Sequence, residues 1–504
     1  MTSNFHRLIM NELNLIPATA EIFLAIAIMA VLVAGLFVHE DSQPLSHRLS
    51  LVAVVITGYI AISDFGASGS SYAFHQMFVN DPMAMLLKLF ACTATFITLI
   101  YSRHYIVARG MLSGSLSGEF YVLALLTLLG QMIMISGNSF LIIYLGLELM
   151  SLSLYALVAL RRDNPISTEA AMKYFVLGAL ASGFMLYGMS MLYGSTGSLN
   201  LTQVAAAIEA GSASKIVLVL GLVLMVAGLA FKLGAAPFHM WAPDVYQGAP
   251  TAITLLLGAA PKLAAFAICM RLLVEGLGAL AADWQQMLVV MSVASLIIGN
   301  ITALAQTNIK RMLAYSTISQ MGFMLLGLSS GVFTSSTSEA AASAYSASMF
   351  YTITYVLTTL GSFATVMLLS REGFEAEHLD DFKGLNQRSP WFAAMMMLFM
   401  FSLAGVPPMV GFYAKLSVLQ AALEAGQVAL VIFAVMMSLV GAFYYLRVIK
   451  LMYFDDAVDT LPLSAPHDMK ILLSINGAAI LVLGLLPGSL MTACLRSITQ
   501  ALAS

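Results

Sequence analysis

Lysine side chains inside apolar segments are the feature of this sequence that could do chemistry. Lys232, Lys262 and Lys415 stand beside a proline or glycine break, and Lys88 and Lys173 lie in uninterrupted apolar stretches. A lysine near the bilayer centre costs about 3 kcal/mol on insertion scales, so each one needs a compensating interaction or a task. Burial favours the neutral amine, which lets a buried lysine accept a proton and pass it on. The pattern favours proton movement that needs no cofactor.

The alternative for each lysine is that its long stem carries the ammonium to the headgroup layer. The two alternatives stand equal for Lys88, which lies near the end of its segment. The headgroup alternative is weaker for Lys173. It is also weak for the three lysines beside the breaks, because irregular backbone at membrane depth needs protein or a wet cavity around it.

Glu148 lies near the middle of the apolar segment 138–160. Such a group is either a protonated carboxyl bonded to a neighbouring helix or the partner of a buried lysine, and the scarcity of central acids favours pairing. Glu21, near the start of the first apolar segment, is expected at the membrane interface. His239 follows a proline break and is either a proton relay or a residue at the cytoplasmic interface.

Two clusters of helix-breaking residues interrupt apolar segments close to the lysines. The first contains Gly234 and Pro237, and the second contains Gly405, Pro407 and Pro408. Proline removes a backbone donor and disrupts the preceding turn. Paired interruptions at corresponding places in two halves of a chain indicate a transport site, and the alternative is a packing kink.

Membrane-spanning helices must position these residues. Of the 504 residues, 60% are hydrophobic and 9% are charged, whereas soluble domains average about 25% charged residues. No nucleotide-binding glycine pattern and no strand pattern is present, and the scattered Cys92, Cys269 and Cys494 predict neither a metal site nor a disulfide framework. Apolar segments of about 20 residues recur along the chain. They predict fourteen spans, at 17–38, 48–64, 83–102, 120–136, 138–160, 170–193, 215–233, 251–273, 286–306, 311–330, 342–369, 391–425, 427–452 and 471–495.

The basic residues support this span count. Thirteen lie in the odd-numbered loops, and the even-numbered loops hold only Lys215 and Arg271, both at span edges. The odd loops are therefore predicted to be cytoplasmic, with both termini on the opposite side. Spans 4–8 and 9–13 each have an interruption in their fourth member, and five is an odd number, so the second copy must be inverted. This predicts an all-α polytopic membrane protein in four parts, which are an N-terminal three-helix segment (1–110), two inverted repeats (111–275 and 276–455) and a C-terminal helix (456–504).

Several stretches resemble a known family. They are Glu148 in its span, "FKLGAAPFHMWAPDVYQGAPT" (231–251), "PKLAAF" (261–266), "QTNIKRMLAYSTISQMG" (306–322) and "LAGVPPMVGFYAKL" (403–416). Together they are similar to the antiporter-like subunits of respiratory complex I, the proton-pumping NADH:quinone oxidoreductase. Lys415, where the M-type subunit has a glutamate, and the absence of the long lateral helix of the L type favour the subunit N (chain 2) type.

The resemblance implies roles for matching positions. Glu148 and Lys232 would be a coupled pair, Lys262 the central relay lysine and Lys415 the terminal one, with Lys173 and His239 as auxiliary groups. The partners would be other membrane-arm subunits, including a second antiporter-like subunit and small helical subunits, in the lipid of a bacterial inner membrane with both termini periplasmic. No nucleic acid is expected. FMN, Fe–S clusters and quinone would be bound by other subunits, and this chain would hold no cofactor, metal or redox site.

The sequence therefore supports a proton-translocating subunit, whose buried Glu/Lys relay is coupled to quinone reduction elsewhere in the complex. The enzyme class would belong to the complex. Three alternatives remain at this point. The chain could be a subunit of a secondary Na⁺/H⁺ antiporter, a membrane subunit of a related hydrogenase, or a structural spacer whose charges only hold helices together.

Overall fold

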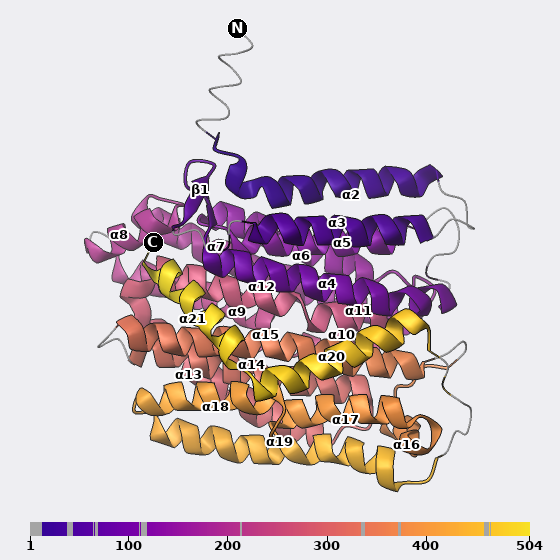
Figure 1. Ribbon diagram of the computed structural model, residues 1–504. Helices are drawn as coiled ribbons and strands as arrows, with labels where there is room; N and C mark the ends of the chain where they lie inside the picture. The colour runs from indigo at the N-terminus through magenta and orange to yellow at the C-terminus, as the bar shows by residue number, and fades with distance from the viewer. Residues whose placement is uncertain are drawn as a thin grey trace.

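Long helices lie side by side and form one bundle in the computed structural model of the chain (Figure 1). The helix α2 begins and the helix α21 ends at the same end of this bundle (Figure 1). The predicted span ends at residues 38 and 64 lie outside the described part of the chain. The structure describes residues 13–37, 44–63, 65, 69–109, 111, 118–211, 214–333, 338–370, 374–457, 463 and 465–503.

The N-terminal part contains three long helices and a small hairpin. A short 3₁₀ turn, η1 (Ile16–Ala18), precedes the helices α2 (Thr19–Phe37), α3 (Pro44–Ile62) and α4 (Pro82–Ala108). Between α3 and α4, the strands β1 (Ser71–Ala73) and β2 (Phe78–Asn80) pair antiparallel. The prediction that the chain has no strand was wrong here, because three-residue strands are too short to show an alternating pattern. The hairpin ends at Asp81, which caps α4 by accepting a hydrogen bond from the Ala84 amide at 2.8 Å.

The next group of helices contains the first interrupted span. Its members are α5 (Glu119–Ile135), α6 (Phe140–Val158), α7 (Pro165–Thr196), the short α8 (Leu201–Glu209), the broken pair α9 (Lys215–Leu233) and α10 (Trp241–Gly248), then α11 (Thr251–Gly258), α12 (Pro261–Cys269) and the π-helix η3 (Met270–Gly276). The segment 251–273 was predicted as one continuous span. The structure divides it, because the backbone of Ala259 leaves the helical conformation just before Pro261.

The last group contains the second interrupted span. Its members are η4 (Gly278–Leu280), α13 (Ala281–Leu304), α14 (Ile309–Phe333), α15 (Ser338–Leu369), η5 (Leu379–Phe382), α16 (Leu385–Arg388), the broken pair α17 (Pro390–Ala404) and α18 (Val410–Glu424), α19 (Val428–Phe454), α20 (His467–Leu485) and α21 (Gly488–Leu502). The predicted span 471–495 is bent rather than straight, because Pro487 separates α20 from α21.

The protein is an all-α, multi-pass membrane protein. Among the described residues, 11 helical segments are long and apolar enough to cross a bilayer. The shorter α5, the α17–α18 pair and the more polar α14 complete the fourteen predicted spans. Small residues allow close helix contact, as membrane packing requires. At Gly130, for example, a Cβ atom would lie 2.5 Å from the Met150 backbone nitrogen of α6. The four-part division and the inversion of the repeats remain predictions.

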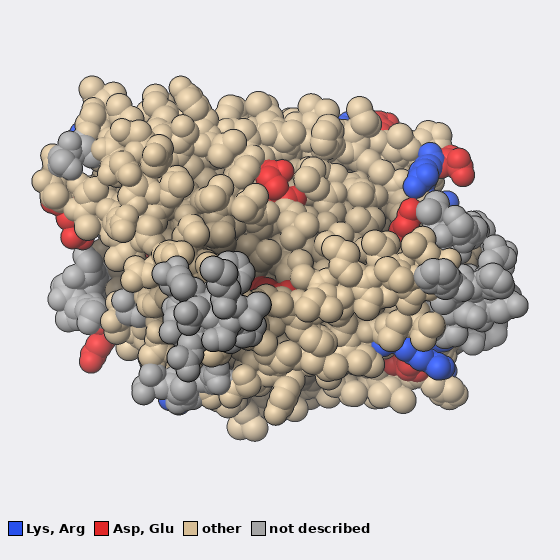
Figure 2. Space-filling model, turned by 90° about the horizontal axis from the view of Figure 1, so that it is seen from above, with Lys and Arg blue, Asp and Glu red and all other residues tan. Residues whose placement is uncertain are grey.

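Charged side chains are unevenly distributed over the surface. On the face seen in Figure 2 they gather towards the two ends of the bundle, and most of the area between is uncharged. Acidic surface is nevertheless visible near the middle of this face, partly within a hollow (Figure 2). The arrangement agrees with a bundle that lies across a membrane and carries a few polar groups at intermediate depth.

Candidate functional site

The first interruption ends α9 with a glycine in the left-handed conformation. Gly234 has a φ of +75°, and the next amide, of Ala235, donates back to the Ala230 carbonyl at 2.8 Å. This is the Schellman arrangement, which turns the chain sharply away from the helix axis. The carbonyl of Leu233 is left facing the interior, at the negative end of the α9 dipole.

Lys262 of α12 binds that carbonyl. Its Nζ donates to the Leu233 oxygen at 2.8 Å and lies 3.4 Å from the Lys232 oxygen. The side chain is 1% exposed, and its ammonium lies 5.7 Å from the centre of the Trp241 ring. A cation is favoured at a helix C-terminus by about 0.3–1 kcal/mol at the surface and by more when partly buried.

Lys232, two residues before Gly234, points into a group of hydroxyls. Its Nζ donates to Ser151 Oγ of α6 at 2.8 Å and lies 3.5 Å from Ser182 Oγ of α7. Glu148, one turn before Ser151, interacts with Lys232 electrostatically but forms no direct ion pair with it. One oxygen of Glu148 is buried without a hydrogen-bond partner among the described residues. The sequence predicted that Glu148 pairs with a buried lysine. In this structure Glu148 and Lys232 interact only at longer range.

The second interruption repeats the first. Gly405 has a φ of +83°, and the Val406 amide donates back to the Phe401 carbonyl at 2.9 Å. The last carbonyl of α17, that of Ala404, accepts a hydrogen bond from Lys415 Nζ at 3.0 Å. Lys415 also donates to Ser438 Oγ of α19 at 2.9 Å.

Aligning the two left-handed glycines along the chain makes Leu233 and Ala404, the residues just before them, equivalent. Lys262 and Lys415 thus bind the same carbonyl of each broken helix, although one comes from a neighbouring helix and the other from the second half of the same span. The glycines give a register that differs by one residue from the one obtained by aligning Pro237 with Pro407. Aligning the prolines puts Lys415 opposite Val245, whereas the glycine conformations put it opposite Asp244.

None of these three lysines forms an ion pair with a carboxylate in the described part of the chain. Their heads are held by backbone oxygens and by serine hydroxyls instead. All three side chains are at least nine-tenths buried, so none of them reaches the headgroup layer. Uncompensated buried cations of this kind are costly unless they can lose the proton.

Lys88 behaves differently from both alternatives that the sequence left open. It neither reaches a headgroup layer nor joins the central lysines, because its Nζ forms an ion pair with Glu21 at 2.7 Å. Lys88 is 1% exposed and Glu21 is 6% exposed, so the pair is buried within the chain. Asn80 Oδ1, at 3.4 Å, adds a weaker contact to the ammonium.

The two auxiliary candidates, as the structure describes them, form no hydrogen bond or ion pair with the three lysines at the interruptions. Lys173 Nζ pairs with Glu169 and Asp244, each at 2.8 Å, and its side chain is 44% exposed. His239 lies in the first interruption and is half-buried, with its Nδ1 atom unpartnered among the described residues. The adjoining Pro237 is exposed, as are Pro407 and Pro408 in the second interruption, so both breaks reach the surface of the chain.

A hydroxyl network between α14 and α15 adjoins Lys415. Gln320 Nε2 donates to the Leu403 carbonyl at 3.1 Å and to the Tyr445 hydroxyl at 3.0 Å, and Tyr351 donates to Gln320 Oε1. A cavity lined by Gln320, Ser402 and Lys415 offers about 10 Å³ to the centre of a water molecule, which is roughly what one water needs. Sequence reasoning missed these residues. Their signal is a polar stripe at helical spacing in α15, at Tyr351, Thr354, Tyr355 and Thr358.

Comparisons with known proteins identify the family. Residues 137–441 match the family model described as NADH:quinone oxidoreductase/Mrp antiporter, TM. The NADH-quinone oxidoreductase subunit N of Herminiimonas arsenicoxydans is 64% identical over 495 residues, which are 98% of this chain and 100% of that protein. The chain belongs to the subunit N family of NADH-quinone oxidoreductases.

Solved structures agree with this assignment. A chain of respiratory complex I from Thermus thermophilus, solved with bound aureothin, is 31% identical with a TM-score of 0.78, and the match covers 94% of this chain and 98% of that one. A chain of the Mrp complex from Dietzia sp. DQ12-45-1b has a TM-score of 0.81 at 20% identity, covering 96% and 97% of the two chains. At this identity the second match shows the shared fold alone.

This member of the subunit N family also contains a buried ion cluster that sequence reasoning missed. Arg271 of η3 was placed at a span edge but is 1% exposed, and it pairs with Asp81 at 2.8 Å and with Glu275 at 2.8 Å. Its Nε also donates to the Ile135 carbonyl at 3.3 Å. The cluster fastens the end of the Lys262 helix to the start of α4. Among the described residues, no group of three metal-ligating side chains is present.

Proposed function

We propose that this chain translocates protons in the membrane arm of an NADH:quinone oxidoreductase, through Lys232, Lys262 and Lys415. The observation that carries the proposal is that all three heads are buried and bound to neutral oxygens. A neutral lysine amine still has two N–H groups, so it keeps its hydrogen bond to a carbonyl or hydroxyl after losing a proton. No carboxylate is left uncompensated when that happens. These lysines can therefore change protonation state with little loss of contacts.

The first transfer is between Lys232 and Lys262. Lys262 Nζ lies 3.4 Å from the backbone oxygen of Lys232, so the central lysine adjoins the residue that holds the first one. Like charges in a low-dielectric interior repel each other. Protonation of Lys232 therefore favours release of the Lys262 proton. A shift of charge near Glu148, driven by quinone reduction elsewhere in the complex, would change the charge on Lys232 and start this step.

The second transfer carries the proton from Lys262 towards Lys415. The hydroxyls and amide of α14 and α15 lie next to Lys415, and their cavity has room for about one water. The described hydrogen bonds do not join Lys262 directly to this network, so the step needs water molecules between them. Lys173 and His239 act only as auxiliary groups, because both lie towards the surface.

Neighbouring membrane-arm subunits are the proposed partners. Glu148 lies on the same face of α6 as Leu141, Leu145 and Leu152, which are 47–54% exposed. Glu148 is half-buried at the edge of this face, with one oxygen buried and unpartnered among the described residues. A carboxyl so close to lipid is unfavourable. It is satisfied if another subunit, either a second antiporter-like one or small helical ones, covers this face. Flavin, iron–sulfur clusters and quinone would be bound by other subunits of the complex.

The orientation follows from the basic residues. Arg109, Arg161, Lys310 and Arg311 gather at one end of the bundle. Basic residues accumulate on the cytoplasmic side of membrane proteins. In a bacterial inner membrane this end would face the cytoplasm, with both termini in the periplasm.

The test is Lys262→Arg in the intact complex, in inner-membrane vesicles. Arginine retains charge and hydrogen bonding but does not release its proton in proteins. NADH:quinone turnover coupled to proton uptake should fall at least about tenfold, as for loss of a proton-transferring group. NADH oxidation by a water-soluble acceptor, which needs no membrane-arm step, should not change.

Three other results would count against the proposal. Normal proton-to-electron stoichiometry in assembled Lys262→Arg complexes would exclude the relay. Cation flux through vesicles without NADH would favour a secondary antiporter. If Lys232→Ala and Lys262→Ala lower the amount of assembled complex, and the complex that does assemble pumps fully, the chain would be a structural spacer.

A further inference from the structure

Lys310 is a fourth buried lysine that binds the end of a short helix. It is the second residue of α14, it is 2% exposed, and its Nζ donates to the Ala249 carbonyl at 3.1 Å. Ala249 caps the C-terminus of α10. Lys310 thus binds a helix-terminal carbonyl, as Lys262 and Lys415 do, but its other neighbour is the Glu377 carboxylate at 3.1 Å.

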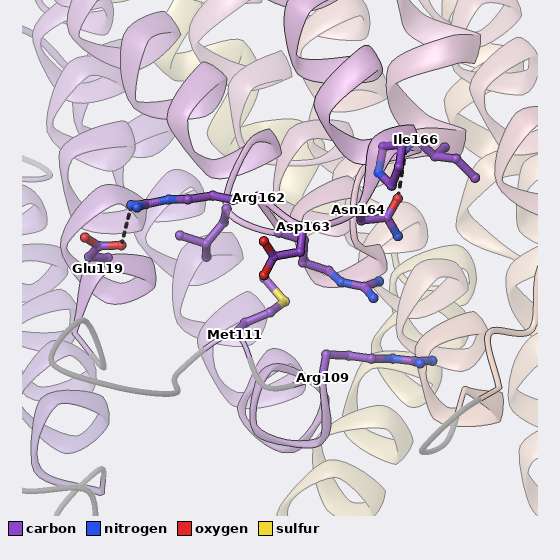
Figure 3. A pocket seen from close by; sticks show the side chains of 10 residues that line it. Arg109, Met111, Glu119, Arg162, Asp163, Asn164 and Ile166 are labelled. Carbon is purple, nitrogen blue, oxygen red and sulfur yellow. Dashed lines mark hydrogen bonds and ion pairs between the residues drawn. The ribbon is translucent and has the colours of Figure 1, made fainter.

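The pair of Lys310 and Glu377 lines a cavity that opens at the basic end of the bundle. This inner cavity has a volume of about 380 Å³ and is also lined by Gln247, Pro250 and Glu375. It adjoins an outer cavity of about 700 Å³ through shared lining residues, among them Arg109 and Asn164. Figure 3 shows the outer cavity, with its arginines and Asp163 around the space. Water can therefore approach the Lys310–Glu377 pair from outside the bundle.

The two carboxylates of the inner cavity differ in their contacts. Glu375 is fully engaged, because it accepts from the Tyr105 hydroxyl at 2.6 Å and the Thr251 hydroxyl at 2.7 Å and pairs with Arg109 at 2.6 Å. Glu377 has Lys310 as its ion-pair partner, and its side chain is 33% exposed. Glu375 thus fastens the segment before η5 to α4 and α11, and Glu377 is left free to exchange with water.

The helix α10 spans the distance between Lys310 and Lys262. Its C-terminal cap is bound by Lys310, and Trp241 at its first position lies beneath the Lys262 ammonium. Eight residues at 1.5 Å each make the helix about 12 Å long. A proton taken up at Lys310 therefore needs to travel roughly one short helix to reach the central lysine.

Two buried hydroxyls, one on α11 and one on α10, lie near the end of α10 that Lys310 binds. Thr254 Oγ1 donates to the Tyr246 carbonyl at 3.0 Å and lies 3.4 Å from the Ala249 oxygen that also binds Lys310. The Tyr246 hydroxyl is fully buried, and its contact with the Thr317 side chain does not meet hydrogen-bond geometry. Buried hydroxyls in this situation are usually satisfied by water. Such a water would lie between the cavity and the interior.

The geometry points to Lys310 and Glu377 as the pair through which protons are taken up on the basic side, one α10 length from Lys262. This inference rests on the proposed function and names its uptake site. The Lys310 ammonium passes a proton to water near Tyr246, and the neutral amine then regains one from cavity water through Glu377. Glu375, Arg109 and Arg161 are the other charged groups that line the cavity around the pair.

Lys310→Arg separates proton uptake from a structural role. Arginine can keep the charge, the contact with the Ala249 carbonyl and the pair with Glu377, but it does not exchange its proton. In vesicles containing the whole complex, NADH:quinone turnover should fall at least about tenfold, with a larger solvent deuterium isotope effect. Proton delivery then limits the rate. As the pH is raised, the activity of the variant should therefore begin to fall at a lower pH than that of the unmodified complex.

The matched control is Lys383→Arg. Lys383 also pairs with a carboxylate, Asp380 at 2.9 Å, but its side chain is 29% exposed and it does not line the cavity. Turnover and isotope effect should equal those of the unmodified complex. If Lys310→Arg does not assemble, Glu377→Gln provides the same test, with a smaller fall in turnover and the same rise in isotope effect.

Measuring Lys262→Arg in parallel distinguishes the two proposals. An inactive Lys262→Arg together with Lys310→Arg and Glu377→Gln at full turnover would overturn the uptake site and leave the relay intact. Full pumping by Lys262→Arg would overturn both. A fall in turnover by Lys310→Arg without any change in isotope effect or pH profile would indicate a structural role and overturn the uptake site.

Discussion

The two helix interruptions and the buried ion pairs of α4 bury charge in opposite ways. At the interruptions, lysine heads face carbonyl and hydroxyl oxygens. At the ion pairs, charge faces charge, with Lys88 against Glu21 and Arg271 against Asp81 and Glu275. Neutralising one member of these ion pairs leaves its partner uncompensated, whereas neutralising an interruption lysine does not. The first arrangement suits groups that change protonation, and the second suits groups that hold helices in place.

The largest effect should come from removing Arg271. Leaving the buried Asp81 with its Ala84 amide bond but no ion-pair partner should cost about 3–5 kcal/mol, as for other broken buried pairs. We expect Arg271→Ala to lower the amount and the thermal stability of assembled complex, measured in detergent extracts. Turnover per assembled complex should change little. A normal yield with defective pumping would place Arg271 with the relay lysines and remove the contrast.

Lys415→Arg should have the next largest effect. The substitution preserves charge near the Ala404 carbonyl and Ser438, but the guanidinium does not release a proton. Proton-coupled turnover should fall about tenfold or more, with assembly unchanged. Turnover and proton uptake in vesicles measure the result, and Lys450→Arg, at an exposed lysine paired with Asp455, is the control. Equal activity of the two variants would contradict the role of Lys415.

The two left-handed glycines allow a finer comparison of the interruptions. Both Gly234→Ala and Gly405→Ala should cost about 1 kcal/mol for the positive φ. At Gly405, a Cβ would also meet Lys415 Cδ at 2.9 Å, whereas the nearest atom at Gly234 is Lys262 Nζ at 3.8 Å. Gly405→Ala should therefore reduce turnover several-fold more than Gly234→Ala, while both lower thermal stability similarly. The reverse order would show that the Lys415 position is not critical.

The smallest effect is expected from Ser151→Ala. It removes one hydrogen bond from Lys232, worth roughly 1.5–3 kcal/mol at most for a charged donor, and Ser182 at 3.5 Å is available to compensate. Turnover should change only a few-fold, with its pH dependence displaced because the ammonium form of Lys232 is less stabilised. The control is Ser153→Ala. Ser153 lies two residues further along α6, and its hydroxyl donates to the Leu149 carbonyl. An unchanged pH profile would show that Ser151 does not influence Lys232.

Periodicity and composition sufficed for the helices but not for the short elements. Runs of about 20 apolar residues predicted the fourteen spans, and Gly234 and Gly405 marked both interruptions. The hairpin at Ser71–Asn80 and the π-helix η3 were missed, because each is shorter than the window over which periodicity can be read. The register that follows from aligning Pro237 with Pro407 differs by one residue from that of the left-handed glycines, because sequence shows where a glycine stands but not its φ.

The sequence by itself determined that five lysines lie within apolar segments and that two of those segments break, one beside Lys232 and one beside Lys415. Both follow from residue type alone, through the cost of charge in hydrocarbon and the backbone limits of proline and glycine. Only the tertiary structure decided which lysines found carboxylates. Lys88 pairs with a residue 67 positions earlier, and Lys262 binds a carbonyl 29 positions away. Such distances in sequence carry no local signal, because the partner is chosen by which helices pack together.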